Sequence, residues 1–360
     1  MSSLQQSLFL SRSISGGGGG TGLFVWGGNN YGQLGTGDTV SRSTPTVVGG
    51  LTWTKISGGI NHSLGISGGK LYAWGLNNFG QLGVGDITAR STPTVVGGLT
   101  TWTEIKVGRD HSLGIAGGKL YAWGVNNYGQ LGLGDKANRS TPTVVGGLTW
   151  TKISPGTYHS LGITGGKLYA WGRNNYGQLG LGDQTSRSTP TVVGGLTTWT
   201  KMSQGAYHSL GITGGKLYAW GLNYYGQLGL GDTIKRSTPT VVGASNTWTE
   251  ISSGRRNSLG LINGKLYTWG MNNIGQLGLG DAVHRSVPVA VGASTTWTKI
   301  SGARYTSLGI AGGKLYTWGS NSNGQLGLGD KTNRSTPTVV GELTTWKIIE
   351  GGLFSLGIIA

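Results

Sequence analysis

Residues 119–145 read KLYAWGVNNYGQLGLGDKANRSTPTVV, and this stretch recurs along the whole chain with small changes. Its Trp-Gly pair returns at intervals of 48 or 49 residues. The seven copies of that pair begin at Trp26, Trp74, Trp123, Trp171, Trp220, Trp269 and Trp318. A second Trp series, mostly followed by Thr, keeps the same period and completes the 14 Trp of the sequence. A repeat of this length is typical of a solenoid, a propeller or another array.

Each unit contains short segments that have the composition of β-strands. They read roughly WTKIS, HSLGI, KLYAWG and RSTPTVV, and Gly, Asn, Asp or Pro residues separate them. Val, Ile, Thr, Tyr and Trp favour strands, and no segment shows a sustained helical period. A Gly-Gly pair, replaced once by Asn263-Gly264, joins HSLGI to KLYAWG and supplies the positive φ angles of a tight hairpin. The sequence therefore predicts four strands per unit, which is one blade of a β-propeller.

The ends of the repeat region predict a closed ring. Repetition begins within a unit at residues 23–27, in the KLYAWG register, and stops at residues 355–359, in the HSLGI register. These two segments are hairpin partners in every other unit, so the N-terminal strand should complete the last blade and leave no free sheet edge. We therefore expect an all-β, seven-bladed propeller over residues 21–360, preceded by an N-terminal arm and Gly-rich tether at 1–20.

Composition limits the classes of function. The 360 residues include no Cys, which excludes disulfides and thiolate metal sites, and no run of 18 apolar residues that would span a membrane. The net charge is +16. Repeated Arg-Ser and Gly-Lys positions, offset by the repeated Asp, account for +6 of this charge, and variable positions account for +10. Such a surplus would attract an acidic protein, a glycan or nucleic acid.

The motif LYAWGxNNYGQLGLGD followed by RSTPTVVG resembles the regulator of chromosome condensation repeat family, from about Leu23 to Ala360. The near-identical units are most similar to repeat arrays of bacterial and bacteriophage proteins. The resemblance implies a seven-bladed propeller but leaves the function open, because members include nucleotide exchange factors, chromatin binders and enzyme inhibitors. The exchange factor uses an inserted wedge, and the nearly equal lengths of these units leave no room for such an insertion.

Two repeated sets of polar residues could suggest a metal or catalytic site, and a structural role is favoured for both. His62, His111, His159 and His208 share one register, in which we expect each imidazole to bond neighbouring backbone. The next three units carry Asn257, Thr306 and Phe354 there. Seven Asp close the Gly-Leu-Gly-Asp loops, and each should cap its own turn and pair with the Arg that follows. We predict no enzyme activity, no metal and no cofactor, because no asymmetric cluster of acid, base and nucleophile is found.

The turn before HSLGI differs most between units. It carries Ile60-Asn61, Arg109-Asp110, Thr157-Tyr158, Ala206-Tyr207, Arg255-Arg256, Arg304-Tyr305 and Leu353-Phe354. Equivalent turns of a propeller emerge on one face, so these side chains should form a ring around the channel mouth. Arg and Tyr are enriched at the energetic centres of interfaces. Neutral variation remains the alternative, but we predict partner binding by Arg109, Asp110, Tyr158, Tyr207, Arg255, Arg256, Arg304 and Tyr305.

The arm before the repeats suggests an anchor. Residues 16–20 are five consecutive Gly, which form a flexible tether, and Leu8, Phe9 and Leu10 could insert into another protein. A tail without a role is the alternative.

These features favour a non-catalytic binding or structural propeller on a larger assembly, with a bacteriophage fibre, tail or capsid-decorating protein as the most concrete version. A chromatin- or GTPase-associated regulator and an inhibitor of a secreted enzyme are the alternatives. A virion or cytoplasmic location is favoured over secretion, because residues 1–15 lack the pattern of a signal peptide.

Overall fold

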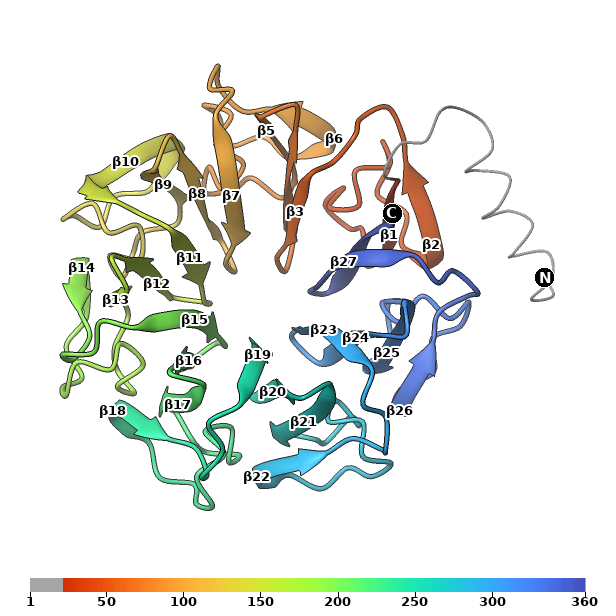
Figure 1. The fold of residues 1–360 in the computed structure, drawn as a ribbon. Coiled ribbons are helices and arrows are strands. Elements are labelled where there is room, and N and C mark those ends of the chain that lie inside the picture. Colours follow the sequence, from red (N-terminus) through yellow and green to blue (C-terminus); the bar gives the residue numbers. More distant parts are fainter. Residues whose placement is uncertain (1–21, 360) are drawn as a thin grey trace.

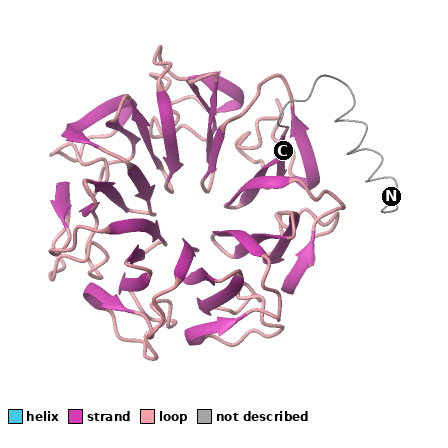
Figure 2. Cartoon of the chain, viewed as in Figure 1, coloured by secondary structure: helices cyan, strands magenta, loops and turns pink. Residues whose placement is uncertain are grey.

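The computed structural model describes residues 22–359, which form seven four-stranded antiparallel sheets arranged as blades around a central channel (Figure 1). The described part of the chain is built from strands, turns and loops (Figure 2), so it contains no apolar helix of membrane-spanning length. The seven-bladed propeller predicted from the repeat is confirmed. The N-terminal arm and its predicted anchor, Leu8, Phe9 and Leu10, lie outside the described residues.

Each blade runs from an inner strand beside the channel to an outer strand at the rim (Figure 1). The inner strands are β3 (Lys55–Gly58), β7 (Trp102–Val107), β11 (Lys152–Pro155), β15 (Trp199–Gln204), β19 (Trp248–Ser253), β23 (Trp297–Gly302) and β27 (Trp346–Gly351). The second strands are β4 (His62–Ser67), β8 (His111–Ala116), β12 (His159–Thr164), β16 (His208–Thr213), β20 (Asn257–Ile262), β24 (Thr306–Ala311) and β28 (Phe354–Ile359).

The long Gly-rich loop of each repeat connects the third strand to the outer strand. The third strands are β1 (Leu23–Gly27), β5 (Lys70–Gly75), β9 (Lys119–Gly124), β13 (Lys167–Gly172), β17 (Lys216–Gly221), β21 (Lys265–Gly270) and β25 (Lys314–Gly319). The outer strands are β2 (Arg42–Val48), β6 (Arg90–Val95), β10 (Arg139–Thr149), β14 (Arg187–Val192), β18 (Arg236–Val241), β22 (Arg285–Ala290) and β26 (Arg334–Val339).

One blade contains both ends of the repeat region. Its order is β2-β1-β28-β27, and β1 pairs with β28 so that Val25 lies opposite Leu356. The inner half of this blade comes from the C-terminal end of the chain and the outer half from the N-terminal end. Closure by the N-terminal strand is thus confirmed, and the ring has no free edge at this seam.

The core consists of Trp and aliphatic side chains packed between neighbouring blades. The Trp of each Trp-Gly pair is fully buried, and its indole nitrogen donates to a Gln carbonyl of the preceding blade, as Trp123 Nε1 does to Gln81 at 2.9 Å. The second Trp series covers the Gly of HSLGI: a Cβ on Gly211 would lie 2.5 Å from the Trp199 ring. Gly at this strand position is therefore required by packing, whatever its backbone conformation.

The hairpin glycines are required for a different reason. Gly68 and Gly69 have φ angles of 55° and 74°, in the left-handed region that favours glycine. Asn263 has φ 49° at the first of these positions and is the sole non-glycine with positive φ among the described residues. The predicted hairpin is confirmed, and the Asn-Gly replacement obeys the same backbone rule.

Replacing Gly211 by Ala should destabilise the propeller by about 1–3 kcal/mol, because the new methyl group overpacks the Trp199 ring. Gly195 provides the control, since no atom lies within 4 Å of its Cβ position and its φ is not in the left-handed region. Gly195→Ala should be neutral or slightly stabilising. Urea unfolding of the two variants measures the difference, and equal stabilities would contradict the packing argument.

Candidate functional site: the channel mouth and its Arg/Tyr face

Two kinds of turn share one face of the propeller. The turns between inner and second strands surround the channel mouth, and the long loops between third and outer strands lie farther out. The hairpins between second and third strands, with their repeated Lys, occupy the opposite face, because they lie at the other end of the same strands. The predicted common face for the variable turns is therefore present.

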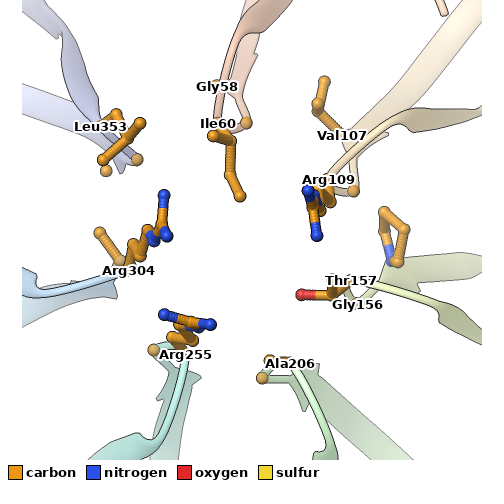
Figure 3. Close-up of a pocket in the computed structure, with 18 of the residues that line it drawn as sticks. Gly58, Ile60, Val107, Arg109, Gly156, Thr157, Ala206, Arg255, Arg304 and Leu353 are labelled. Atoms are coloured by element: carbon orange, nitrogen blue, oxygen red, sulfur yellow. The ribbon is translucent and has the colours of Figure 1, made fainter. Parts of the chain in front are cut away.

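The two positions of each variable turn have different surroundings. The first position points into the channel mouth, where Ile60, Arg109, Thr157, Ala206, Arg255 and Arg304 surround a cavity (Figure 3). The second position contacts the long loops in two blades, where Tyr158 packs on Tyr128 and Tyr207 packs on Tyr176. Tyr207 also borders the cavity.

The seventh turn differs from its prediction. Phe354 is buried and pairs with Gly27, in the register that His62 and Gly75 occupy in another blade, so it belongs to β28 rather than to the turn. This turn is one residue shorter than the others, and Leu353 alone represents it at the cavity. The placement of Phe354 in the histidine register is therefore confirmed, and its placement in the variable turn was wrong.

Arg173 is the centre of an aromatic cluster that the sequence did not reveal. Its guanidinium carbon lies 4.9 Å from the ring centre of Tyr128, 5.4 Å from that of Tyr158 and 5.8 Å from that of Tyr207. These rings come from three consecutive blades, and Tyr176 packs edge-on against Tyr207. Cation–π contacts of this geometry hold the cation in place. Arg173 follows a Trp-Gly pair, a position that is uncharged in the other six repeats, and this was the available signal.

The remaining arginines are also held by tyrosines. Arg109 donates to the Tyr158 hydroxyl, Arg255 donates to the Tyr305 hydroxyl, and Arg256 donates to the Tyr225 hydroxyl at 3.1 Å. We call the whole set the Arg/Tyr face; it comprises Arg109, Tyr128, Tyr158, Arg173, Tyr176, Tyr207, Tyr225, Arg255, Arg256, Arg304 and Tyr305.

Asp110 lies beside this face as a partner of Arg109. Its carboxylate is 3.1 Å from Arg109 Nε and is mostly buried. Burial raises the pKa of the Asp110 carboxyl, and the Arg109 charge opposes that rise. Asp110 therefore orients Arg109, and its predicted contact with a partner stays a prediction.

The four repeated histidines connect neighbouring blades. His111 Nε2 lies 3.0 Å from the Ser160 hydroxyl of the next blade, and that hydroxyl donates to the Gln130 carbonyl at 2.9 Å. Because the serine proton is already donated, the histidine donates from Nε2. Burial lowers the pKa of the imidazole to about 3, so the ring is neutral at pH 7. The expected structural role agrees with the burial of these rings, but the predicted backbone partner was wrong: a serine hydroxyl takes its place. We call the set the histidine ladder, with the pairs His62–Ser112, His111–Ser160, His159–Ser209 and His208–Ser258.

The repeated Asp residues complete the loops, as predicted. Asp135 accepts from the Ala137 backbone N–H and pairs with Arg139 at 2.5 Å, and both interactions hold the pKa of its carboxyl below the ordinary value. Equivalent ion pairs of 2.5–2.6 Å occur in all seven blades. Within residues 22–359, no group of three or more His, Asp or Glu is placed to hold a metal ion.

The comparisons with known proteins agree with this architecture. The model of the regulator of chromosome condensation (RCC1) repeat matches residues 22–66, 68–115, 117–163, 165–212, 214–261, 263–310 and 312–353. The chain belongs to the RCC1 repeat family. No curated protein sequence matches this chain.

Solved structures of two other RCC1-like propellers share the fold. Human WBSCR16 has a TM-score of 0.83 at 22% identity, over 94% of this chain and 98% of that one. Prp20p of Saccharomyces cerevisiae has a TM-score of 0.85 at 22% identity, over 95% of this chain and 92% of that one. At this level of identity, the likeness shows the fold of an RCC1 propeller, and the function has to be argued from the site.

Proposed function

We propose that this RCC1 propeller is a non-catalytic binding protein whose Arg/Tyr face recognises an acidic protein surface. The observation that carries the proposal is the gathering of arginines that lack a carboxylate partner. Within residues 22–359, Arg173, Arg255 and Arg256 form no ion pair, and Arg304 forms none either. The seven repeated arginines, in contrast, are each paired with their own Asp. The Arg/Tyr face therefore gathers the arginines whose charge no carboxylate offsets.

The tyrosines favour a protein partner over diffuse electrostatic attraction. They fix the arginine side chains before binding, so less side-chain conformational entropy is lost when a partner binds. Tyr and Arg together also supply large contact areas with few free torsions, as at the energetic centres of protein interfaces. A face that attracted negatively charged partners without specificity would not need tyrosines to fix its arginine side chains.

A chromatin- or GTPase-associated regulator is the second candidate. The structural study of Prp20p describes its binding properties to Gsp1p and histones, and that propeller shares the fold of this chain. A related role here would include contact with nucleic acid phosphates. Such contact would make affinity fall steeply with salt, because each neutralised phosphate releases counterions.

The experiment compares two variants that lose the same charge on opposite faces. One replaces Arg109, Arg173, Arg255, Arg256 and Arg304 by Gln; the other replaces Lys70, Lys119, Lys167, Lys216 and Lys265 by Gln. Fluorescence anisotropy with labelled poly-L-glutamate and with duplex DNA serves as the readout.

We expect the arginine variant to weaken poly-L-glutamate binding more than about 10-fold and the lysine variant to weaken it less than about threefold, since exposed charges on the far face are screened. Equal losses in the two variants would show that net charge alone drives binding and would refute the proposal. Tighter binding of DNA than of poly-L-glutamate, with a steep salt dependence, would favour the second candidate.

Presentation on a larger assembly is a finer part of the proposal. The near-identical repeats and the five-glycine tether of the arm support it, and a bacteriophage particle is the concrete version. The arm, glycan binding, inhibition of a secreted enzyme, and a virion or cytoplasmic location stay predictions from sequence alone.

A further inference from the structure

The channel mouth contains a cavity of about 400 Å³. It is enclosed by the ends of all seven inner strands and the turns that follow them (Figure 3). This volume lies within the range of small-molecule sites in proteins, about 300–1,000 Å³. Glycines line much of the wall, as Gly108, Gly156 and Gly205 do, so the backbone approaches the cavity closely.

The charge of the cavity lining has one sign. Arg109, Arg255 and Arg304 line it and direct their guanidinium groups toward the channel (Figure 3). Among residues 22–359, no Asp or Glu belongs to the lining. The carboxylate of Glu350, on an inner strand next to the cavity, is neutralised by Lys106 Nζ at 2.6 Å. Asp110 compensates Arg109, so Arg255 and Arg304 provide the unbalanced positive charge.

Two buried polar side chains in the same lining have no hydrogen-bond partner. Gln204, at the end of β15, is 8% exposed, and neither its amide nitrogen nor its amide oxygen is bonded within the described structure. The Ser253 hydroxyl, at the end of β19, is 7% exposed and also unbonded. Buried polar groups in native proteins normally have partners. Both residues adjoin the cavity, and both differ from the Gly, Val or Pro at equivalent positions of other blades.

We propose that this cavity binds one oxyanion group, a phosphate or carboxylate, of a small ligand. Arg304 and Arg255 would neutralise its charge. The Gln204 amide nitrogen and the Ser253 hydroxyl, which are buried in the cavity wall, would rotate toward the ligand and donate hydrogen bonds to its oxygens. Charge-assisted hydrogen bonds of this kind are the stronger ones in proteins. The inference goes beyond recognition of a protein surface, because a ligand inside the cavity needs only the lining residues.

Isothermal titration calorimetry with pyrophosphate, with citrate and with an acetylated tetraglutamate peptide tests the proposal. We expect at least one probe to bind with 1:1 stoichiometry and a dissociation constant on the order of 10 µM at low ionic strength. Gln204→Leu and Arg304→Gln should each weaken that binding about 10-fold or more. Lys216→Gln, on the opposite face, is the matched charge control and should change it less than about twofold.

The outcomes distinguish a free small ligand from an acidic side chain of a partner protein. They also distinguish binding in the cavity from binding on the Arg/Tyr face. Binding of pyrophosphate or citrate alone identifies a free ligand, whereas binding of the peptide alone identifies an acidic side chain of a partner; both support an oxyanion site. Arg173→Gln with Arg256→Gln should weaken poly-L-glutamate binding and spare the small probes, because neither residue lines the cavity. Absence of saturable binding, or binding that Gln204→Leu and Arg304→Gln leave unchanged in folded protein, would overturn the proposal.

Discussion

Deletion of residues 1–49 is expected to abolish folding to a soluble monomer. The deletion removes β1 and β2, the outer half of the seam blade. Leu23, Phe24, Val25 and Trp26 are at most 1% exposed, and their burial contributes on the order of 10 kcal/mol. This is comparable to the whole stability of a typical domain, about 5–15 kcal/mol. The deletion would also leave β28 as an unpaired edge that promotes aggregation.

A circular permutant provides the control for the deletion. It begins at Gly50, continues to Ile359, and is joined through an added Gly-Gly turn to residues 22–48. The turn copies the hairpin of the other blades, where Thr164 lies opposite Lys167 across Gly165-Gly166. We expect the permutant to unfold cooperatively, like the parent, in urea monitored by tryptophan fluorescence. A deletion variant as stable as the permutant would show that closure does not hold the ring together.

Acidification should destabilise the propeller through the histidine ladder. Burial lowers the pKa of His62, His111, His159 and His208 from 6.5 to about 3. As the pH falls, the histidines of the unfolded chain therefore take up protons before those of the folded chain. The stability that the neutral histidines contribute is complete above pH 6.5 and is lost as the pH falls toward 3. At about pH 5, each histidine costs on the order of 2 kcal/mol, and four cost on the order of 8 kcal/mol.

The chain itself offers the substitution that tests this effect. Asn257 occupies the ladder register in another blade, so the four histidines are replaced together by Asn. This variant should be less stable at pH 7, because the imidazole–hydroxyl bonds are lost, but its free energy of unfolding should change little between pH 7 and pH 5. The exposed His284, outside the ladder, is the control for a His→Asn exchange. Parallel pH profiles of the parent and the four-Asn variant would contradict the assignment.

The blade and the face of the variable turns could be predicted because each depends on a pattern within one repeat, and the ring could be predicted because the repeat region begins and stops at hairpin partners. The Gly-Gly pair predicts a hairpin and the Trp-Gly period predicts the spacing of the blades, and the structure has both. The contacts of Arg173 could not be predicted in the same way, because its three tyrosines come from separate blades. The ladder partner escaped prediction for the same reason: His111 and Ser160 are 49 residues apart, and only the blade geometry brings them together.

The shortened seventh turn shows a second limit of the sequence. Comparison of repeats placed Phe354 both in the histidine register and in the variable turn, because it assumed turns of equal length and this turn lacks one residue. Strand pairing resolves this, because Phe354 lies opposite Gly27 as the ladder histidines lie opposite their own glycines. The cavity also required the structure, since neither Gln204 nor Ser253 is distinctive in the sequence until its neighbours are known.

The four His–Ser hydrogen bonds of the histidine ladder are unevenly distributed around the ring of blades. They cross four consecutive blade boundaries, from the blade of β4 to the blade of β20. The other three boundaries, where Asn257, Thr306 and Phe354 replace the imidazole, include both sides of the blade in which the two chain ends meet. Mechanical tension or heat would therefore separate the disc first along this arc, while the opposite arc would stay intact longest.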